Sequence, residues 1–101
     1  MFWVYMLSCA DGAYYVGSHR GADIAVRVGE HNAGIDPRAF TYPRRPVTLI
    51  WSETFQDALD MVIWERRLKG WSRAKKEALI RGDWAAVQRL ARSPRPSTSS
   101  G

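Results

Sequence analysis

The sequence contains a single cysteine, Cys9, among its 101 residues. One thiol can build neither a disulfide framework nor a tetrahedral zinc site, and sparse cysteine favours the reducing cytoplasm. No apolar run approaches the roughly 20 residues of a membrane-spanning helix. The apolar start at residues 1–7 lacks the basic leader and small-residue cleavage site of a signal peptide. We therefore expect a cytoplasmic protein without a membrane segment, and we expect its first residues to form a strand.

Several common catalytic patterns are missing as well. The sequence has no glycine-rich phosphate loop and no Ser-His-Asp spacing. The two histidines, His19 and His31, cannot complete a zinc site of ordinary spacing with one distant cysteine. Cys9 falls on a predicted buried strand, which makes it a poor nucleophile. The remaining candidates for chemistry are Tyr, Arg, His and Glu side chains.

The composition indicates a small folded domain with a basic surface. Apolar residues make up 46% of the chain and include five tryptophans, which excludes an intrinsically disordered chain. At this length we expect one domain over residues 1–92 and a disordered tail at 93–101. The net charge is +5, and twelve of the fifteen cations are arginines. Arginine fits phosphate oxygens and suits a polyanionic partner, although codon composition would explain the same bias.

Hydrophobic pattern and turn residues predict strands followed by helices, with a central strand where both faces are apolar. Asp23, Ser72 and Asp83 are predicted helix caps, and glycines close the first three helices. Three prolines predict an irregular loop at 35–46. The expected strands are 2–9, 13–18 and 47–51, and the expected helices are 24–32, 57–69, 73–81 and 84–91. This order predicts an α/β (α+β) sandwich with a three-stranded, mostly antiparallel sheet flanked by helices.

The turn at residues 10–12 decides where two tyrosines point. A three-residue loop ending in glycine is a known hairpin connection, with the glycine in the left-handed region. It pairs Leu7 with Tyr15 and Tyr5 with Gly17. The two tyrosines then share one face of the sheet as diagonal neighbours. A two-residue turn would place them on opposite faces, so the functional hypothesis below requires the longer loop.

Each candidate site residue, taken alone, also has a structural explanation. Tyr5 and Tyr15 fit core aromatics of strands that keep one polar end. Arg27 and His31 are one helical turn apart and fit a solvated charged face. Glu65 fits a helix-surface carboxylate paired with a nearby Lys or Arg. The functional hypothesis therefore depends on their combination.

These residues occur together in a fixed order and spacing. The sequence carries Val4-Tyr5, then Tyr15-Val16-Gly17, then Arg27 with His31, and finally Glu65 within the segment 64–73. In this order the chain resembles the GIY-YIG nuclease family, particularly its small stand-alone bacterial members. The resemblance covers residues 2–85, and the two tyrosine motifs resemble the pair for which the family is named.

The resemblance implies hydrolysis of a DNA phosphodiester bond with one divalent metal ion, magnesium or alternatively manganese. Glu65 would hold the metal as one oxygen ligand among waters, and Arg27 would clamp a phosphate oxygen. Tyr5 would be the general base, as a phenolate favoured by Arg27, His31 or the metal. Tyr15 would position Tyr5 and the attacking water by hydrogen bonding. His31 would share proton transfer or hold a phosphate.

Basic residues around the later helix and on the proline-rich loop are candidates for nucleic-acid binding. Such cations contact phosphates, and the interleaved Trp64 and Trp71 can stack on bases or pack in the core. The candidates are Arg44, Arg45, Arg66, Arg67, Lys69, Arg73, Lys75 and Lys76. With no recognition helix or zinc finger in the sequence, we expect structure-selective or nonspecific cleavage of DNA, in repair or turnover. A protein partner that supplies targeting is the alternative.

The chain also departs from the family pattern. Trp3 stands where the family name has Gly, and Val4 and Val16 replace Ile. The later Asn of many members has no counterpart, because Asn32 is the only asparagine.

Two other functions remain open from the sequence. One is a nucleic-acid-binding module that cleaves poorly or not at all, which predicts salt-sensitive binding without metal-dependent nicking. The other is a protein-interaction adaptor anchored by exposed Trp and Arg, which predicts no DNA affinity at moderate salt.

Overall fold

The structure is a computed structural model and describes residues 1–92. Three strands form one antiparallel sheet in the order β2-β1-β3. The strands are β1 (Phe2–Ser8), β2 (Tyr14–Arg20) and β3 (Thr48–Phe55), the helices are α1 (Ile24–Ala33), α2 (Ala58–Lys69), α3 (Arg73–Ile80) and α4 (Trp84–Arg92), and a short 3-10 helix is η1 (Tyr42–Arg44). The predicted fold class, a three-stranded antiparallel sheet with helices, is confirmed.

The hairpin between β1 and β2 has the predicted register. Its turn contains a glycine with a φ of +88° in the left-handed region, as a three-residue connection requires. Leu7 pairs with Tyr15, and Tyr5 pairs with Gly17. The rings of Tyr5 and Tyr15 therefore lie on one face of the sheet, with centroids 6.2 Å apart.

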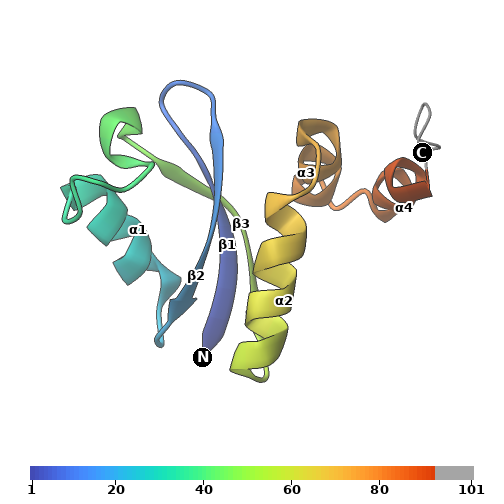
Figure 1. Cartoon of the computed structure of the whole chain (residues 1–101), viewed down its shortest axis with the longest axis horizontal. Coiled ribbons are helices and arrows are strands. Elements are labelled where there is room, and N and C mark those ends of the chain that lie inside the picture. Colours follow the sequence, from blue (N-terminus) through green and yellow to red (C-terminus); the bar gives the residue numbers. More distant parts are fainter. Residues whose placement is uncertain (93–101) are drawn as a thin grey trace. The chain divides into compact units, whose positions relative to one another are not determined.

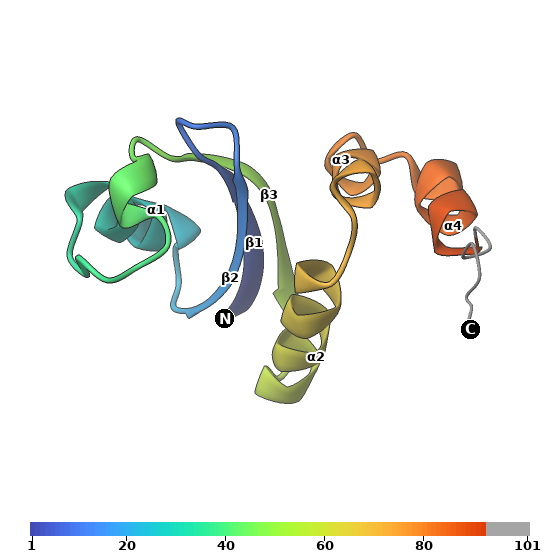
Figure 2. The same cartoon turned by 45° about the horizontal axis from the view of Figure 1, so that its top comes forward.

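The central strand β1 is covered on both faces, as predicted. Its alternate side chains point to opposite sides of the sheet. Tyr5 and Leu7 share a buried cluster with Ile24 of α1. Val4 and Met6, also buried, face the other side, where α2 lies (Figure 1). Figure 2, turned by 45°, again shows α1 and α2 on opposite sides of the sheet.

The other elements differ from the predicted ones mainly in length. β3 continues to Phe55, beyond the predicted end at Trp51, because residues 52–54 pair with β1 in spite of their polarity. Helix α1 starts where predicted, since the Asp23 carboxylate accepts a hydrogen bond from the Ala25 amide. Between α1 and β3 the chain forms turns and η1 rather than a regular element.

The described chain divides into two compact units, Met1–Lys69 and a second unit that begins at Gly70. The first holds the sheet, α1 and α2. The second holds α3 and α4, which pack on each other. None of the helices within residues 1–92 combines the length and the apolar character of a membrane-spanning segment. The single domain over 1–92 stays a prediction, and the predicted tail at 93–101 lies outside the described residues.

Candidate active site

Tyr5 of β1, His31 of α1 and Thr41 of the following loop form one hydrogen-bonded chain. The Tyr5 hydroxyl lies 2.8 Å from Nε2 of His31. Nδ1 of the same ring lies 2.8 Å from Oγ1 of Thr41. Tyr5 and Thr41 are both buried, and Thr41 is only 1% exposed. Three segments of the first unit therefore converge on one imidazole.

The donors and acceptors in this chain assign a tautomer to His31. Nε of Arg27 donates to the Tyr5 oxygen at 3.4 Å, so that oxygen already accepts one hydrogen bond. The buried phenol keeps its proton and needs an acceptor, which is Nε2 of His31. The ring proton of His31 is then on Nδ1, from which it is donated to Thr41. In this assignment both ring nitrogens and the phenol have a partner.

Gly17 leaves the space that the Tyr5 phenol occupies. It is the partner of Tyr5 across the hairpin. A Cβ atom built on Gly17 would lie 2.5 Å from the Tyr5 hydroxyl oxygen and 2.8 Å from Cε2 of Tyr15. The φ angle of Gly17 is not positive, so space rather than backbone conformation requires the glycine. The position of the two phenols thus explains the glycine of the second motif.

A pocket of about 270 Å³ opens between α1 and the loop that follows it. Its walls include Tyr15, Arg27, Glu30, His31, Phe40 and Thr41. The Tyr15 ring stacks on Phe40, with centroids 6.0 Å apart, and meets the His31 ring edge-on at 5.3 Å. Nη1 of Arg27 pairs with Glu30 at 3.1 Å. The pocket therefore offers a guanidinium and an imidazole beside aromatic rings, which suits an anionic group joined to a flat one.

Burial raises the pKa of Tyr5 to about 12, and the hydrogen bond and charge of Arg27 offset only part of that effect. In this structure the hydrogen bond and charge of Arg27 lower the pKa of Tyr5 less than burial raises it, so Tyr5 is a neutral phenol. The phenolate expected beside Arg27, His31 or the metal stays a prediction. Burial also lowers the pKa of His31, and the charge of Arg27 acts in the same direction. Near pH 7 a neutral phenol thus donates to a neutral imidazole.

Glu65 of α2 is within electrostatic reach of Tyr5, because its charge contributes to the raised pKa of that phenol. The Glu65 side chain is 19% exposed, and Oε2 lies 3.0 Å from Nζ of the more exposed Lys69. One carboxylate open to water is a ligand that Mg²⁺ accepts, since this ion keeps several waters. Residues 1–92 contain no group of three His, Cys, Asp or Glu side chains that could hold a metal. The donor set therefore fits magnesium better than zinc or a calcium cage.

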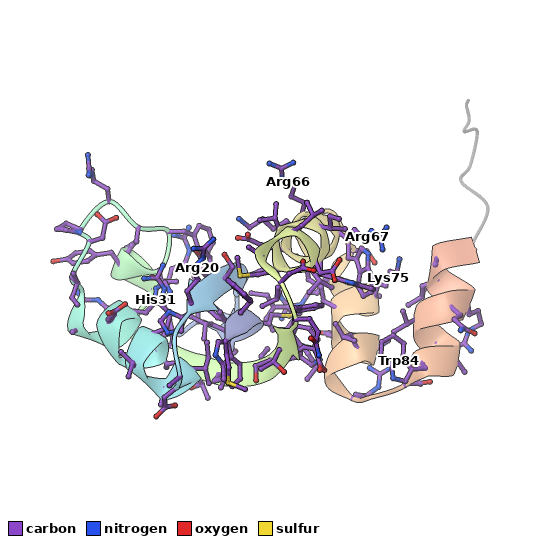
Figure 3. All side chains as sticks on the ribbon, turned by 90° about the horizontal axis from the view of Figure 1, so that it is seen from below. Arg20, His31, Arg66, Arg67, Lys75 and Trp84 are labelled. Atoms are coloured by element: carbon purple, nitrogen blue, oxygen red, sulfur yellow. The ribbon has the colours of Figure 1, made fainter. Side chains whose placement is uncertain are left out.

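The structure thus brings Tyr5, Tyr15, Arg27 and His31 into contact or close proximity, with Glu65 within electrostatic reach. Figure 3 labels His31 on the part of the molecule that carries α1. The contact between the two tyrosines is a tilted ring contact. The catalytic roles predicted for the five residues stay predictions.

Arg44 and Arg45, predicted to bind nucleic acid, also hold the loop in place. The Arg44 guanidinium lies 3.8 Å from the centre of the Phe40 ring, and its Nε lies 3.0 Å from Oδ2 of Asp11. Arg45 lies 4.1 Å from the centre of the Tyr42 ring and donates to the Tyr42 carbonyl. These contacts support the aromatic wall of the pocket.

The predicted cations of α2 differ in their surroundings. Arg66 is exposed and points away from the helix (Figure 3). Arg67 lies 5.2 Å from the centre of the Trp64 ring, which itself stacks on Phe55. Trp64 is therefore held by the protein, as the core-packing alternative expects, while Arg66 is accessible to a phosphate.

The predicted cations of α3 belong to the second unit. Arg73 pairs with Glu77 at 3.2 Å. Nζ of Lys75 lies 4.0 Å from the centre of the Trp71 ring. Lys76 is half-buried, and burial lowers its pKa. Nucleic-acid binding by these residues stays a prediction.

Sequence reasoning missed Thr41 and Phe40. Both lie in the segment predicted only as an irregular loop, where no periodicity assigns a side chain to a face. The Thr41 hydroxyl shares a hydrogen bond with the ring of His31, ten residues earlier in the chain. No spacing rule links a loop threonine to that ring. The one signal for Phe40 is an aromatic residue four positions before Arg44, which stacks on it.

The positions that depart from the family pattern have structural roles. Nε1 of Trp3 donates to the Gly21 carbonyl at 3.0 Å, just beyond the end of β2. The Asn32 side chain donates to the Val47 carbonyl at 3.0 Å and accepts from its amide at 2.7 Å, which ties α1 to the start of β3. Neither residue lines the pocket, so Asn32 does not stand in for the family's later Asn.

The chain is similar to a known protein family and to several individual proteins. The family model described as the GIY-YIG catalytic domain matches residues 1–78. A UPF0213 protein of Halobacterium salinarum is 46% identical over 80 residues, which are 79% of this chain and 100% of that protein. A UPF0213 protein of Desulfotalea psychrophila is 35% identical over 80 residues, which are 79% of this chain and 71% of that protein.

A solved structure agrees with these sequence matches. The solution NMR structure of a UPF0213 protein from Bacillus halodurans is similar, with a TM-score of 0.50 and 30% identity. The match covers 90% of this chain and 98% of that one. The names of these relatives state no activity. The family match extends from β1 through most of α3, and so we conclude that this chain belongs to the GIY-YIG nuclease family.

Proposed function

We propose that this protein is a metal-dependent endonuclease that hydrolyses phosphodiester bonds of DNA, in repair or turnover in the cytoplasm. The observation that carries the proposal is the Tyr5 hydroxyl, held between His31 and Arg27 beside the pocket. A tyrosine that only fills the core needs one hydrogen-bond partner for its hydroxyl, whereas the Tyr5 hydroxyl has both a histidine and an arginine. GIY-YIG nucleases generally use divalent metals. We propose magnesium here, with manganese as the alternative, held by Glu65.

The proposed base is the pair of Tyr5 and His31. The attacking water gives a proton to the Tyr5 oxygen while the Tyr5 proton moves to Nε2 of His31. His31 becomes an imidazolium whose Nδ1–H is still donated to Thr41. No free phenolate forms, so the raised pKa of Tyr5 does not block this transfer.

Arg27 would have two tasks in the reaction. Its guanidinium clamps a phosphate oxygen and places positive charge where negative charge develops. Tyr5 is fully buried, and Nε of Arg27 covers its oxygen at 3.4 Å. Movement of Arg27 onto the phosphate would therefore open the Tyr5 oxygen to water.

The remaining site residues would bind and orient. Tyr15 packs against the rings of Tyr5 and His31 and fixes their positions. A divalent ion at Glu65 would polarise the phosphate and stabilise the leaving oxygen. Arg66, which is exposed on α2, is a candidate phosphate contact of the first unit. Phosphate contacts carry no sequence information, so we expect structure-selective or nonspecific cleavage. The alternative is a protein partner that supplies targeting.

One observation favours the alternative of a binding module with little cleavage. Tyr5 has no exposed surface, and Glu65 is paired with an ammonium group. If Arg27 and Lys69 keep these positions when nucleic acid binds, Arg27 covers the Tyr5 oxygen and Lys69 competes with a metal ion for Glu65. The chain would then bind nucleic acid and leave it intact.

The two functions are separated by a cleavage assay. The protein is incubated with nicked, flapped, branched, duplex and single-stranded DNA, and with matched RNA, in magnesium, manganese or chelator. The proposal expects cleavage of at least one DNA that requires the metal. Salt-sensitive binding with no metal-dependent product on any substrate supports the binding module and contradicts the nuclease.

A further inference from the structure

The net charge of the chain is confined to its second unit. Residues 1–69 carry eight Lys or Arg and eight Asp or Glu, whereas residues 70–101 carry seven and two. The boundary between these segments is also the boundary between the two compact units. The unit that holds the candidate active site is therefore neutral, and the formal charge of +5 belongs to the chain from Gly70 onward.

We propose that the unit formed by α3 and α4 binds the phosphate backbone of nucleic acid and supplies most of the affinity of the protein. A neutral catalytic unit gains little from the long-range attraction that governs binding to a polyanion. A second unit that carries all the excess charge supplies that attraction. This inference rests on the proposed function, because a nuclease needs its substrate held near the active site.

The side chains of this unit fit a phosphate backbone. Its two carboxylates are already paired, Glu77 with Arg73 at 3.2 Å and Asp83 with Arg81 at 3.7 Å, so their repulsion of phosphates is reduced. Arg89 is exposed on α4. These groups leave a surface on which the positive charges outnumber the negative ones.

Two aromatic residues lie among these cations. Lys75 is held with its ammonium 4.0 Å from the Trp71 ring centre. Trp84, at the start of α4, is 57% exposed. Figure 3 labels Lys75 and Trp84 on the two helices of this unit. Aromatic rings among cations suit nucleic acid, whose bases can stack beside the phosphates.

The packing of the two helices argues against a membrane surface as the partner. An amphipathic helix binds lipid through a wide exposed apolar face. Here apolar residues of both helices are buried: Ala78 and Leu79 in α3, and Ala86 and Val87 in α4. Among the described residues of this unit, the large exposed apolar side chains are those of Trp84 and Leu90. Helix α4 also lies beyond residue 78, where the match to the GIY-YIG catalytic domain ends, as expected for an addition to the catalytic unit.

The test measures binding separately from cleavage. The full chain with Glu65→Gln is titrated with labelled duplex and single-stranded DNA over a range of salt concentrations. We expect Lys75→Gln with Arg89→Gln to lower the slope of log K against log salt by about 1.4 to 1.8, which weakens binding about 25- to 60-fold at 0.1 M salt. Lys75→Arg with Arg89→Lys keeps both charges and should bind like the parent chain.

The matched control removes the same charge from the first unit. Arg20→Gln with Arg38→Gln changes two exposed arginines, of which the Arg38 side chain is 94% exposed. We expect this pair to change the dissociation constant less than threefold. An equal loss of affinity in both double variants overturns the inference, as does no loss in the Lys75 and Arg89 pair. Circular dichroism of each variant verifies that it is folded.

These titrations, together with the cleavage assay of the same variants with Glu65 intact, separate this inference from the proposed function. A chain that binds DNA through Lys75 and Arg89 but cleaves nothing contradicts the nuclease and supports the binding unit. A chain that cleaves with magnesium but binds equally well without these two charges contradicts the binding unit alone. Binding to phosphatidylserine vesicles without affinity for DNA would overturn the inference and identify a membrane surface.

Discussion

The Tyr5 hydroxyl lies 2.8 Å from Nε2 of His31, although the two residues are 26 positions apart in the sequence. β1 supplies the phenol and α1 supplies the imidazole, because α1 packs on the face of the sheet to which Tyr5 points. The two side chains share one hydrogen bond in a buried setting. They should therefore behave as one proton-transfer unit.

Removing the Tyr5 oxygen should remove that unit. Tyr5→Phe keeps the ring in the core and deletes the group between His31 and Arg27. We expect the single-turnover cleavage rate in magnesium to fall about 100-fold or more. The Tyr5→Phe, His31→Ala double variant should be little slower than the slower single variant, because both changes break the same step. A loss below about threefold in Tyr5→Phe would exclude proton transfer by this residue.

The raised pKa of Tyr5 predicts a loss of stability in alkali. An exposed tyrosine in the unfolded chain ionises near pH 10, whereas the pKa of folded Tyr5 is about 12. Between these values the unfolded state binds fewer protons, so the free energy of unfolding falls as pH rises. Compared with Tyr5→Phe, the wild type should lose about 1.4 kcal/mol more between pH 9 and pH 11. Urea titrations at both pH values measure the difference, and parallel losses in the two proteins would contradict it.

Thr41 should act as a positioning residue through His31. Thr41→Val keeps the volume and deletes the acceptor of Nδ1–H, so the ring proton moves towards Nε2, which can then no longer accept from Tyr5. We expect cleavage to fall about tenfold, equivalent to about 1.4 kcal/mol, while Thr41→Ser keeps its activity.

The pH profile separates this role from a purely structural one. Because burial lowers the pKa of His31, wild-type cleavage should stay level down to about pH 6.5 and fall only as His31 becomes protonated at lower pH. Thr41→Val should lower the level part of the profile. If Thr41→Val and Thr41→Ser lose activity equally, the hydroxyl does not set the tautomer.

Gly17 can be tested against a matched glycine. Gly17→Ala puts a methyl group 2.5 Å from the Tyr5 oxygen, so the phenol must leave His31 and we expect cleavage to fall about 100-fold. Gly29→Ala makes the same change on α1, where the added methyl group has no atom within 4 Å beyond its chain neighbours and the nearby backbone of the helix itself. It should raise stability by about 0.5 to 1 kcal/mol and leave cleavage unchanged. Equal activity of the two variants would show that Gly17 does not position Tyr5.

The hairpin of β1 and β2 was predictable from the sequence, because its signals are local. The glycine of the first turn fixes the register of Tyr5 against Gly17, and Asp23 fixes the start of α1. β3 was predicted too short because its last residues are polar, and only pairing with β1 makes them a strand. Local chemistry therefore predicts where elements begin better than how far a neighbouring strand extends them.

The candidate site was predictable only in part, for a related reason. The tyrosine pair and the Arg27–His31 step follow from strand alternation and helical spacing. The pKa of Tyr5 depends on its burial, which no spacing reveals, so the sequence did not show that Tyr5 is a neutral phenol in this structure. Thr41 reaches His31 from an irregular loop, where neither period applies. The distribution of charge becomes informative only once the boundary at Gly70 is known.

The most direct test of the proposed nuclease activity is the Glu65→Gln variant, in which an amide group replaces the carboxylate. Glu65→Gln keeps the size of the side chain and removes the charge that would attract a divalent ion. Glu53→Gln makes the same change at an exposed position of β3 and serves as the control. The measurement is single-turnover cleavage of the best DNA substrate in magnesium, together with the dissociation constant for that DNA. We predict that Glu65→Gln abolishes cleavage, while its dissociation constant for DNA and its melting temperature match those of Glu53→Gln. Full cleavage by Glu65→Gln would contradict the claim that this protein is a metal-dependent nuclease.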